Sequence, residues 1–286
     1  MISHHPDCAV LCVEGAESPS FLQDILTSQI EQLETGLARP ACLLTPQGRV
    51  LFDMMVLRTT PTSFLLITEQ QQAEALKKRL SLYKLRRDVS LSVEAGWQCG
   101  HMMSDIATDA SELPQEVITA TDERHPGLGR LAVWKDGAVG PEHLGADDDW
   151  QQARIEAGIP QGADDLEPGR ALMLEAGLHL IGGVDFDKGC YIGQEVTART
   201  HYRGLVKRRI VPVTAQTGRL QTGKAVSMQD KDIGVVLSCH PSARIALASL
   251  RLEAIHNHLS GTSLASDGTE IQVQIPNWMM PLPVQK

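Results

Sequence analysis

The segment Asp185-Phe-Asp-Lys-Gly-Cys-Tyr-Ile-Gly-Gln-Glu-Val-Thr-Ala-Arg199 gathers a thiol, an amide, carboxylates and cations into one short stretch. The apolar run from Ile181 to Phe186 predicts a short strand, and Asp187 predicts a turn after it. From Gly193 or Gln194 to about Tyr202 the residues favour a helix, and Gly204 stands where a C-terminal cap is expected. The segment therefore predicts a turn that leads into a helix.

The thiol in this segment, Cys190, falls just ahead of the predicted helix and beside Lys188. A helix N-terminus and a nearby cation both favour the thiolate form of cysteine. We therefore expect Cys190 to be a reactive thiol that Lys188 tunes. The alternative is that Cys190 is a small buried packing residue, because free cysteines are often buried. Glu195 and Arg199 are four residues apart, in the order that favours an ion pair on a helix surface.

The sequence Lys-Gly-Cys-Tyr-Ile-Gly-Gln-Glu at 188–195 resembles the signature of the YgfZ family, folate-binding proteins tied to the maturation of iron–sulfur enzymes. That family is related to the glycine-cleavage T-protein, an aminomethyltransferase also called GcvT. The segment Arg154–Pro160 resembles one that precedes the signature in both groups, and the match continues through Glu175-Ala176 and 182–186. These segments follow one another in the expected order.

The resemblance implies an α+β, GcvT/YgfZ-like fold built around a central cavity. A two-lobed folate-binding region would cover residues 1–205, with the second lobe inserted at roughly 50–145, and a C-terminal β-barrel would cover 206–286. The residues point the same way. Apolar runs at Arg39–Leu44 and Arg49–Arg58 predict a hairpin, and Gln70–Leu82 predicts a helix. The strand–strand–helix–strand order that continues to Val93 favours a ferredoxin-like unit. Five short strand candidates among glycine and proline turns, at 210–213, 225–227, 233–237, 245–250 and 270–275, favour a small barrel.

Local patterns predict several further elements. Asp7–Val13 predicts a strand, and Ser18-Pro19 predicts the start of a helix that runs to Gly36. Apolar residues at helical spacing along this helix predict a core face; they are Phe21, Leu22, Ile25, Leu26, Ile30 and Leu33. Residues 103–115 predict a loop. The acidic triplet Asp147–Asp149 fits the start of a helix over 150–157, because the helix dipole favours carboxylates there.

The composition excludes several classes of protein. The chain has 286 residues, a formal net charge of −9 and a pI near 5.6. An acidic chain argues against non-specific binding to a nucleic-acid backbone, which favours a basic surface. No apolar run reaches the ~18 residues of a membrane span, and the first residues lack the pattern of a secretory signal. We therefore expect a cytoplasmic protein, and a monomer.

The cysteines and histidines predict no permanently bound metal. Six cysteines in a chain of this length, without a Cys-x-x-Cys pair, do not indicate a disulfide framework or a resident iron–sulfur cluster. Cys8 and Cys12 lie in the first predicted strand, where we expect both to be packing residues. His4 and His5 belong to an N-terminus that is expected to fray, and no His-Glu-x-x-His helix indicates zinc.

A reduced folate makes three demands on a binding site. Its pteridine edge offers N–H donors to a carboxylate, its rings need apolar or aromatic walls, and its glutamate tail needs arginine or lysine. The resemblance implies that Glu175 grips the pteridine. The other candidates are Arg199, Arg208 and Arg209 for the tail, Tyr191 or Tyr202 for the walls, and Gln194 and Glu195 for orienting the ligand or neighbouring groups.

Two positions depart from the family pattern. Met173 stands where relatives have a proline, two positions before the glutamate. The T-protein has adjacent aspartates after a Gly-Gly hairpin, and the matching positions here are Phe52 and Asp53. Only one carboxylate is kept, so direct aminomethyl transfer is disfavoured while a folate pocket that includes Asp53 remains possible.

The sequence therefore predicts a tetrahydrofolate-binding protein that assembles or repairs iron–sulfur clusters in client enzymes, with Cys190 as the reactive group. Its expected partners are folate and iron–sulfur client enzymes or assembly proteins. Two alternatives stay open. The first is a folate-dependent one-carbon transferase of the aminomethyltransferase type, and the second is a folate-regulated scaffold whose thiol is inert.

Overall fold

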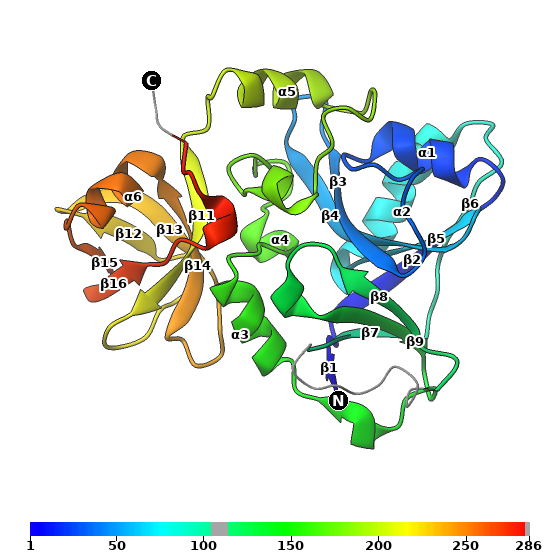
Figure 1. Ribbon diagram of the computed structural model, residues 1–286, viewed down its shortest axis with the longest axis horizontal. Helices are drawn as coiled ribbons and strands as arrows, with labels where there is room; N and C mark the ends of the chain where they lie inside the picture. The colour runs from blue at the N-terminus through cyan, green and yellow to red at the C-terminus, as the bar shows by residue number, and fades with distance from the viewer. Residues whose placement is uncertain (104–113, 284–286) are drawn as a thin grey trace.

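The computed structural model describes residues 1–103 and 114–283. A ten-stranded sheet with its helices forms one part of the molecule, and a closed six-stranded barrel forms the other (Figure 1). The predicted α+β class and the C-terminal barrel are confirmed. Most of the loop predicted at 103–115 lies outside the described residues.

The ten-stranded sheet consists of two halves joined at a short parallel ladder. In this ladder, Leu37 pairs with Thr121 and Ala38 with Asp122. The strand order is β10 (Leu144–Gly145), β1 (Ile2–His4), β7 (Trp97–Met102), β9 (Arg130–Lys135), β8 (Ile118–Asp122), β3 (Leu37–Leu44), β4 (Val50–Thr60), β5 (Ser63–Glu69), β2 (Cys8–Glu14) and β6 (Ser90–Val93). The predicted lobe start near residue 50 falls within the antiparallel β3–β4 hairpin; the domain bounds stay a prediction.

Helices α1 (Ser18–Ile25) and α2 (Gln70–Lys84) contribute to the core of the N-terminal half. The predicted strand at 7–13, the hairpin and the helix from Gln70 are confirmed. The helix predicted from Ser18 to Gly36 is wrong in length, although its apolar stripe is buried. Helix α1 ends early because polar groups after it bind the chain elsewhere: Thr27 Oγ1 donates to Gly183 O at 2.6 Å, and Ser28 Oγ donates to Pro40 O at 2.6 Å.

Two further sequence predictions are wrong. The N-terminus does not fray, because residues 2–4 form β1 and pair with both β7 and β10. The strand predicted at 181–186 is absent, and a 3₁₀ helix, η4 (Leu178–Ile181), precedes a series of bends. Gly177 and Gly182 flank η4 with φ values of +78° and +80°, a left-handed backbone that interrupts an extended strand.

Three helices lie between the sheet and the barrel in sequence: α3 (Asp148–Glu156), α4 (Gly162–Asp165) and α5 (Gln194–Tyr202). The helices predicted at 150–157 and 194–202 are confirmed. Figure 1 shows α3 and α4 between the sheet and the barrel, and α5 above them. Among the described residues, no helix is both long enough and apolar enough to span a lipid bilayer.

The barrel closes in the order β11 (Arg208–Ala215), β14 (Ile245–Arg251), β13 (Lys231–Cys239), β12 (Ala225–Met228), β15 (Leu264–Ser266) and β16 (Thr269–Val273). Five of these strands match predicted ones. Strand β15 and helix α6 (Leu252–Leu259), which follows β14 directly, were not predicted. Strand β15 has three residues, too few to show an alternating pattern.

A buried ion pair joins the α3–α4 segment to the barrel. Arg154 Nη1 donates to Asp165 Oδ2 at 2.7 Å and to Ile159 O at 2.8 Å. The same two side chains reach β13, because Arg154 Nη2 donates to Ser238 Oγ at 3.1 Å and Ser238 N donates to Asp165 Oδ1 at 3.0 Å. The segment Arg154–Pro160, singled out by resemblance, thus supplies a structural joint.

We expect Asp165→Ala to lower the free energy of unfolding by about 3–5 kcal/mol, because it leaves the buried Arg154 charge without its partner. Urea unfolding measures this. The control is Glu167→Ala, which breaks the exposed Glu167–Arg170 pair and costs at most about 1 kcal/mol. Equal losses in both variants would contradict the assigned role of Asp165.

Candidate functional site

A cavity of about 380 Å³ lies where the sheet, the α3–α4 segment and the barrel meet. Strands β4 and β5 supply one wall, with Asp53, Met54, Met55, Ile67, Thr68 and Glu69. The barrel supplies Ser238, Cys239 and Pro241, and the opposite end of the sheet supplies Cys99, His101 and Leu131. The cavity thus combines apolar walls with a few charged groups, as small-molecule sites usually do.

Asp53 is a carboxylate of the cavity wall. It follows Phe52 on β4, and successive residues of a strand face opposite sides, so Phe52 packs against the α1 core while Asp53 lines the cavity. Its Oδ2 accepts a hydrogen bond from Gly162 N at 3.0 Å. Burial, with a smaller contribution from the charge of Glu69, raises the pKa of Asp53 to about 6. The aspartate kept from the family pair therefore faces the cavity.

Glu69 lies beside Asp53 at the junction of β5 and α2. Its carboxylate accepts from Ala163 N at 3.2 and 3.1 Å and from Gln72 Nε2 at 2.6 Å. Asp53 and Glu69 thus bind successive N–H groups of the chain at Gly162 and Ala163. These bonds hold the α4 segment against the sheet and form one edge of the cavity.

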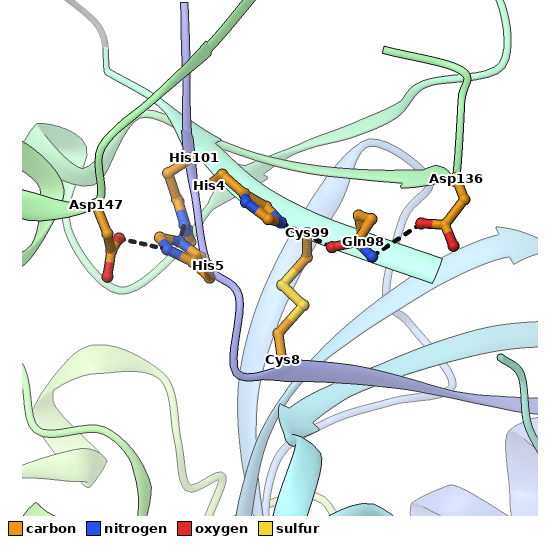
Figure 2. Close-up of a disulfide and its surroundings, with 8 residues drawn as sticks. All are labelled: His4, His5, Cys8, Gln98, Cys99, His101, Asp136 and Asp147. Atoms are coloured by element: carbon orange, nitrogen blue, oxygen red, sulfur yellow. Dashed lines mark hydrogen bonds and ion pairs between the residues drawn. A yellow bond between two sulfur atoms is a disulfide. The ribbon is translucent and has the colours of Figure 1, made fainter. Parts of the chain in front are cut away.

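A chain of buried and partly buried polar side chains lies along the opposite wall. His5 Nε2 lies 2.7 Å from His101 Nδ1, and His101 Nε2 lies 3.0 Å from Asp122 Oδ2 (His5 and His101 are drawn in Figure 2). Arg124 donates to Asp122 Oδ2 from Nη2 at 2.7 Å. At the other end, Asp147 Oδ1 lies 2.5 Å from His5 Nδ1. The imidazole of His101 stacks on Trp150 with ring centroids 4.5 Å apart.

Burial and charge set the protonation of this network. Burial lowers the pKa of His101 to about 4, so the ring is neutral near pH 7. Burial by itself raises the pKa of Asp122, but the Arg124 charge and the His101 hydrogen bond outweigh it and hold that pKa well below its usual range. No local pattern in the sequence predicts this network, because its residues come from distant segments of the chain.

Cys190 is exposed and has a free thiol. The neighbouring Lys188 is directed elsewhere: its ammonium donates to the carbonyl oxygens of Gln23 and, at 2.5 Å, of Leu26. Burial lowers the pKa of Lys188 to about 8. Gln23 Nε2 donates back to Lys188 O at 3.2 Å, so Lys188 secures the Cys190 loop to the end of α1.

The three residues after Cys190 fix the loop to the rest of the molecule. Tyr191 is buried in the core shared with the barrel, and Ile192 packs against the core beneath α1. Gly193 has a φ of +81°, and a Cβ at this position would lie 2.6 Å from Thr45 O in the β3–β4 turn. Cys190 is therefore presented at the surface by an anchored loop.

Helix α5 carries the remaining residues of the signature. Gln194 is partly buried, whereas Glu195 and Arg199 are exposed. Within the described part of the chain, these two charges do not form the ion pair that their spacing favours. Tyr202 is also exposed, and its ring centroid lies 6.0 Å from that of Phe186. None of these four signature-helix side chains lines the 380 Å³ cavity.

Glu175 is partly buried near two arginines of β11. Burial lowers the pKa values of Arg208 and Arg209, that of Arg209 to about 10. The negative charge of Glu175 opposes both shifts. Arg208 Nη2 donates to Ser249 O at 2.9 Å, and the buried Arg209 Nη1 donates to Leu174 O at 2.8 Å. Of the residues expected to bind the cofactor, only Asp53 lines the cavity.

A disulfide joins Cys8 and Cys99 in the cavity wall (Figure 2). The prediction that Cys8 is a packing residue is therefore wrong, because a partner 91 residues away approaches it from another strand. Cys12, Cys42, Cys190 and Cys239 are free. Within 1–103 and 114–283, no three histidine, cysteine or acidic side chains are grouped closely enough to hold a metal ion.

We expect Gly193→Ala to be more destabilising than Gly182→Ala, which changes a glycine of similar φ with open space around it. The left-handed backbone alone costs about 1–2 kcal/mol for an alanine. The approach to Thr45 O adds roughly 1–3 kcal/mol for Gly193→Ala. Urea unfolding compares the two variants, and equal losses would show that Gly193 does not anchor the loop.

The raised pKa of Asp53 predicts a pH dependence. Between pH 3.8 and about 6 the folded protein keeps this carboxyl protonated while the unfolded chain ionises it. The contribution of Asp53 to the free energy of unfolding is therefore fully present below this range and is lost as pH rises through it. Relative to Asp53→Asn, the wild-type free energy of unfolding should fall by at most about 2–3 kcal/mol. Urea unfolding of both proteins at several pH values measures this fall. Parallel curves of the free energy of unfolding against pH for the two proteins would refute the prediction.

Comparison with known proteins places the chain in a family. It is 32% identical to the mouse protein named iron-sulfur cluster assembly factor IBA57, mitochondrial, over 94% of this chain and 83% of that protein. It is 34% identical to the human protein of the same name over 71% of this chain and 63% of that protein. Residues 207–281 match the family described as CAF17, C-terminal beta-barrel domain.

The fold is also found in a solved structure. The crystal structure of glycine cleavage system aminomethyltransferase T from Bartonella henselae superposes with a TM-score of 0.76 at 17% identity, over 97% of this chain and 85% of that one. The predicted GcvT-like fold is thus confirmed. The expected cytoplasmic localisation is contradicted, because the relatives are named as mitochondrial proteins. The resemblance to YgfZ is thus confirmed only at the level of the wider family, and the chain belongs to the IBA57 family of iron–sulfur cluster assembly factors.

Proposed function

We propose that this protein acts in the assembly or repair of iron–sulfur clusters in client enzymes, with Cys190 as its reactive thiol and tetrahydrofolate, or a derivative, as its ligand. Membership of the IBA57 family carries the first part of the proposal. The partners are then iron–sulfur assembly proteins or client enzymes. The thiol and the folate are supported by separate features of the molecule.

The support for Cys190 is its presentation. Among the free cysteines Cys12, Cys42, Cys190 and Cys239, it is the one that is exposed to solvent. Lys188, Tyr191 and Gly193 anchor the loop on both sides of it, so the thiol reaches solvent on an ordered backbone. An accessible thiol can act as a nucleophile, a transient ligand of a metal or a redox group. A partner protein can reach such a group without any opening of the fold.

The support for folate is the fit of the cavity. A volume of about 380 Å³ is within the range of small-molecule sites. Asp53 and Glu69 offer carboxylate oxygens suited to the amine and N–H donors of a pteridine, and Met54, Met55 and Ile67 offer apolar walls.

Tyr191 adds a further polar group near the cavity. It lies close enough to the cavity residue Cys42 for that thiol to affect it electrostatically, and its buried hydroxyl has no hydrogen-bond partner among the described residues. Burial raises the pKa of Tyr191 to about 12, so the hydroxyl keeps its proton and can donate it in a hydrogen bond. An orphaned buried hydroxyl fits a role in contacting a ligand.

In this proposal, different residues bind different parts of the folate. Asp53 binds the pteridine edge, with Glu69 beside it. Glu175, Arg208 and the α5 residues Gln194, Glu195 and Arg199 lie outside the cavity lining, and we propose them for the folate tail or for a partner surface. A bound folate would supply a one-carbon carrier or a redox-active pteridine; the chain supplies the carboxylates that orient it and the apolar walls that exclude water.

We expect wild-type protein to bind tetrahydrofolate in isothermal titration calorimetry, and Asp53→Asn to bind roughly tenfold or more weakly, because a hydrogen bond to a charged group is worth about 1.5–3 kcal/mol. Cys190→Ser and the surface control Glu167→Ala should bind as the wild type does. Loss of binding in Glu175→Ala with retention in Asp53→Asn would move the pteridine to Glu175. No binding by the wild type would remove folate from the proposal.

We expect Cys190→Ser to fail to restore iron–sulfur enzyme activity in cells that lack the protein, while Cys12→Ser restores it. The reason is that Cys12 is a partly buried thiol away from the cavity, and burial raises its pKa to about 11. Enzyme activities and the amount of each variant are measured together. Full restoration by Cys190→Ser would favour the scaffold alternative with an inert thiol.

The one-carbon transferase remains the second candidate. The observation that favours it is that the retained aspartate, Asp53, faces the cavity rather than the core. The side chain of Phe52 lies on the opposite face and leaves one carboxylate at this place instead of two. Release of one-carbon units from an aminomethylated lipoyl carrier in the presence of tetrahydrofolate would establish the transferase.

A further inference from the structure

The Cys8–Cys99 disulfide occupies an unusual place for a covalent bond that only adds stability. Cys8 lies at the start of β2 and Cys99 in β7, so the bond joins the two halves of the sheet. Both residues line the cavity together with His5 and His101. Cys99 is buried, whereas Cys8 is partly accessible. Cys8 is therefore the more accessible member of the pair.

The disulfide also controls the position of a cavity residue. His5 N donates to Cys99 O at 2.9 Å, and Cys8 N donates to His5 O at 3.3 Å. The backbone of His5 is therefore held by both cysteines of the pair. Its imidazole in turn contacts His101 and Asp147 (Figure 2). Breaking the sulfur–sulfur bond removes the covalent constraint on either side of His5.

The hydrogen-bond geometry places a proton at this wall. His101 Nε2 faces the Asp122 carboxylate, so Nε2 carries the ring proton and Nδ1 accepts. His5 Nε2 must then donate to His101 Nδ1. His5 Nδ1 lies 2.5 Å from Asp147 Oδ1, so the imidazole of His5 stands between His101 and the Asp147 carboxylate beside the disulfide.

We propose that Cys8 and Cys99 form a thiol–disulfide exchange site that opens into the cavity and takes a low-molecular-weight dithiol as its reductant. A thiolate of the dithiol attacks Cys8 Sγ; the bond between Cys8 and Cys99 breaks, and Cys99 leaves with the electron pair and takes up a proton. The second thiol of the reductant then attacks the mixed disulfide at the reductant's own sulfur and releases Cys8. Two electrons and two protons pass from the dithiol to the pair.

The redox state of the Cys8–Cys99 pair determines the structure of the cavity wall around His5. In the oxidised protein the two halves of the sheet are tied beside His5, and in the reduced protein two thiols line the cavity with His5 released from the constraint. In compartments that contain glutathione, disulfides usually have redox-sensing or catalytic roles. A cystine that faces a ligand cavity fits such a role better than a purely structural one.

The test follows the rate of reduction of the full chain by dithiothreitol at low urea concentrations, with alkylation by iodoacetamide and peptide mapping. Exchange through the cavity predicts that Cys8 and Cys99 become alkylated at a rate that low urea does not change, in wild type and in Cys12→Ser alike. A rate that rises with urea as global unfolding does would overturn the proposal, because the bond would then react only in the unfolded chain. Alkylation of both Cys8 and Cys99 before the reductant is added would also overturn the proposal, because the two thiols would then not be bonded to each other.

A second readout tests the link to His5. Reduction should shift the imidazole NMR signals of His5 and His101 and leave unchanged that of His258, which lies on α6 and bonds to Thr262 O at 2.8 Å. Unchanged signals of His5 and His101 after complete reduction would refute the coupling. Neither measurement uses folate or an iron–sulfur client, so a failure here leaves the proposed function standing, and the converse also holds.

Discussion

The buried contact between Arg154 and Asp165 is the constraint on which the rest of the structure depends. Both side chains also bind Ser238 of the barrel, so one ion pair fixes the α3–α4 segment and the barrel together. The cavity lies where these parts meet the sheet. Removing either partner would leave a charge buried in a low-dielectric joint, which is why the two must occur together.

The signature segment 188–195 combines anchoring with presentation. Lys188 caps carbonyl groups at the end of α1, Tyr191 and Ile192 enter two different cores, and Gly193 lets the backbone pass close to the β3–β4 turn. Cys190 is left at the surface between these anchors. Most residues of this motif therefore hold the loop in place. The exposure of its one thiol, that of Cys190, depends on the contacts of the other residues.

The carboxylates around the cavity differ in whether they have a basic partner. Arg124 pairs with Asp122, and Asp147 lies against the His5 ring, so each carboxylate on the side opposite Asp53 has a polar partner. Asp53 lacks an arginine or lysine partner in the described ion pairs and has a raised pKa. A carboxyl whose pKa is raised by burial thus faces the space for a ligand, which is typical of functional sites.

The sequence by itself determined the α+β class, the barrel, the hairpin before Asp53 and the helix from Gln194, because apolar period, turn residues and caps are local signals. It also located Cys190. Only the tertiary structure decided that Lys188 binds α1, that Glu175 lies outside the cavity lining, and that Cys8 meets Cys99 beside His5. Those contacts join residues far apart in the chain, and their formation depends on how the two halves of the sheet and the barrel pack, which no local pattern encodes.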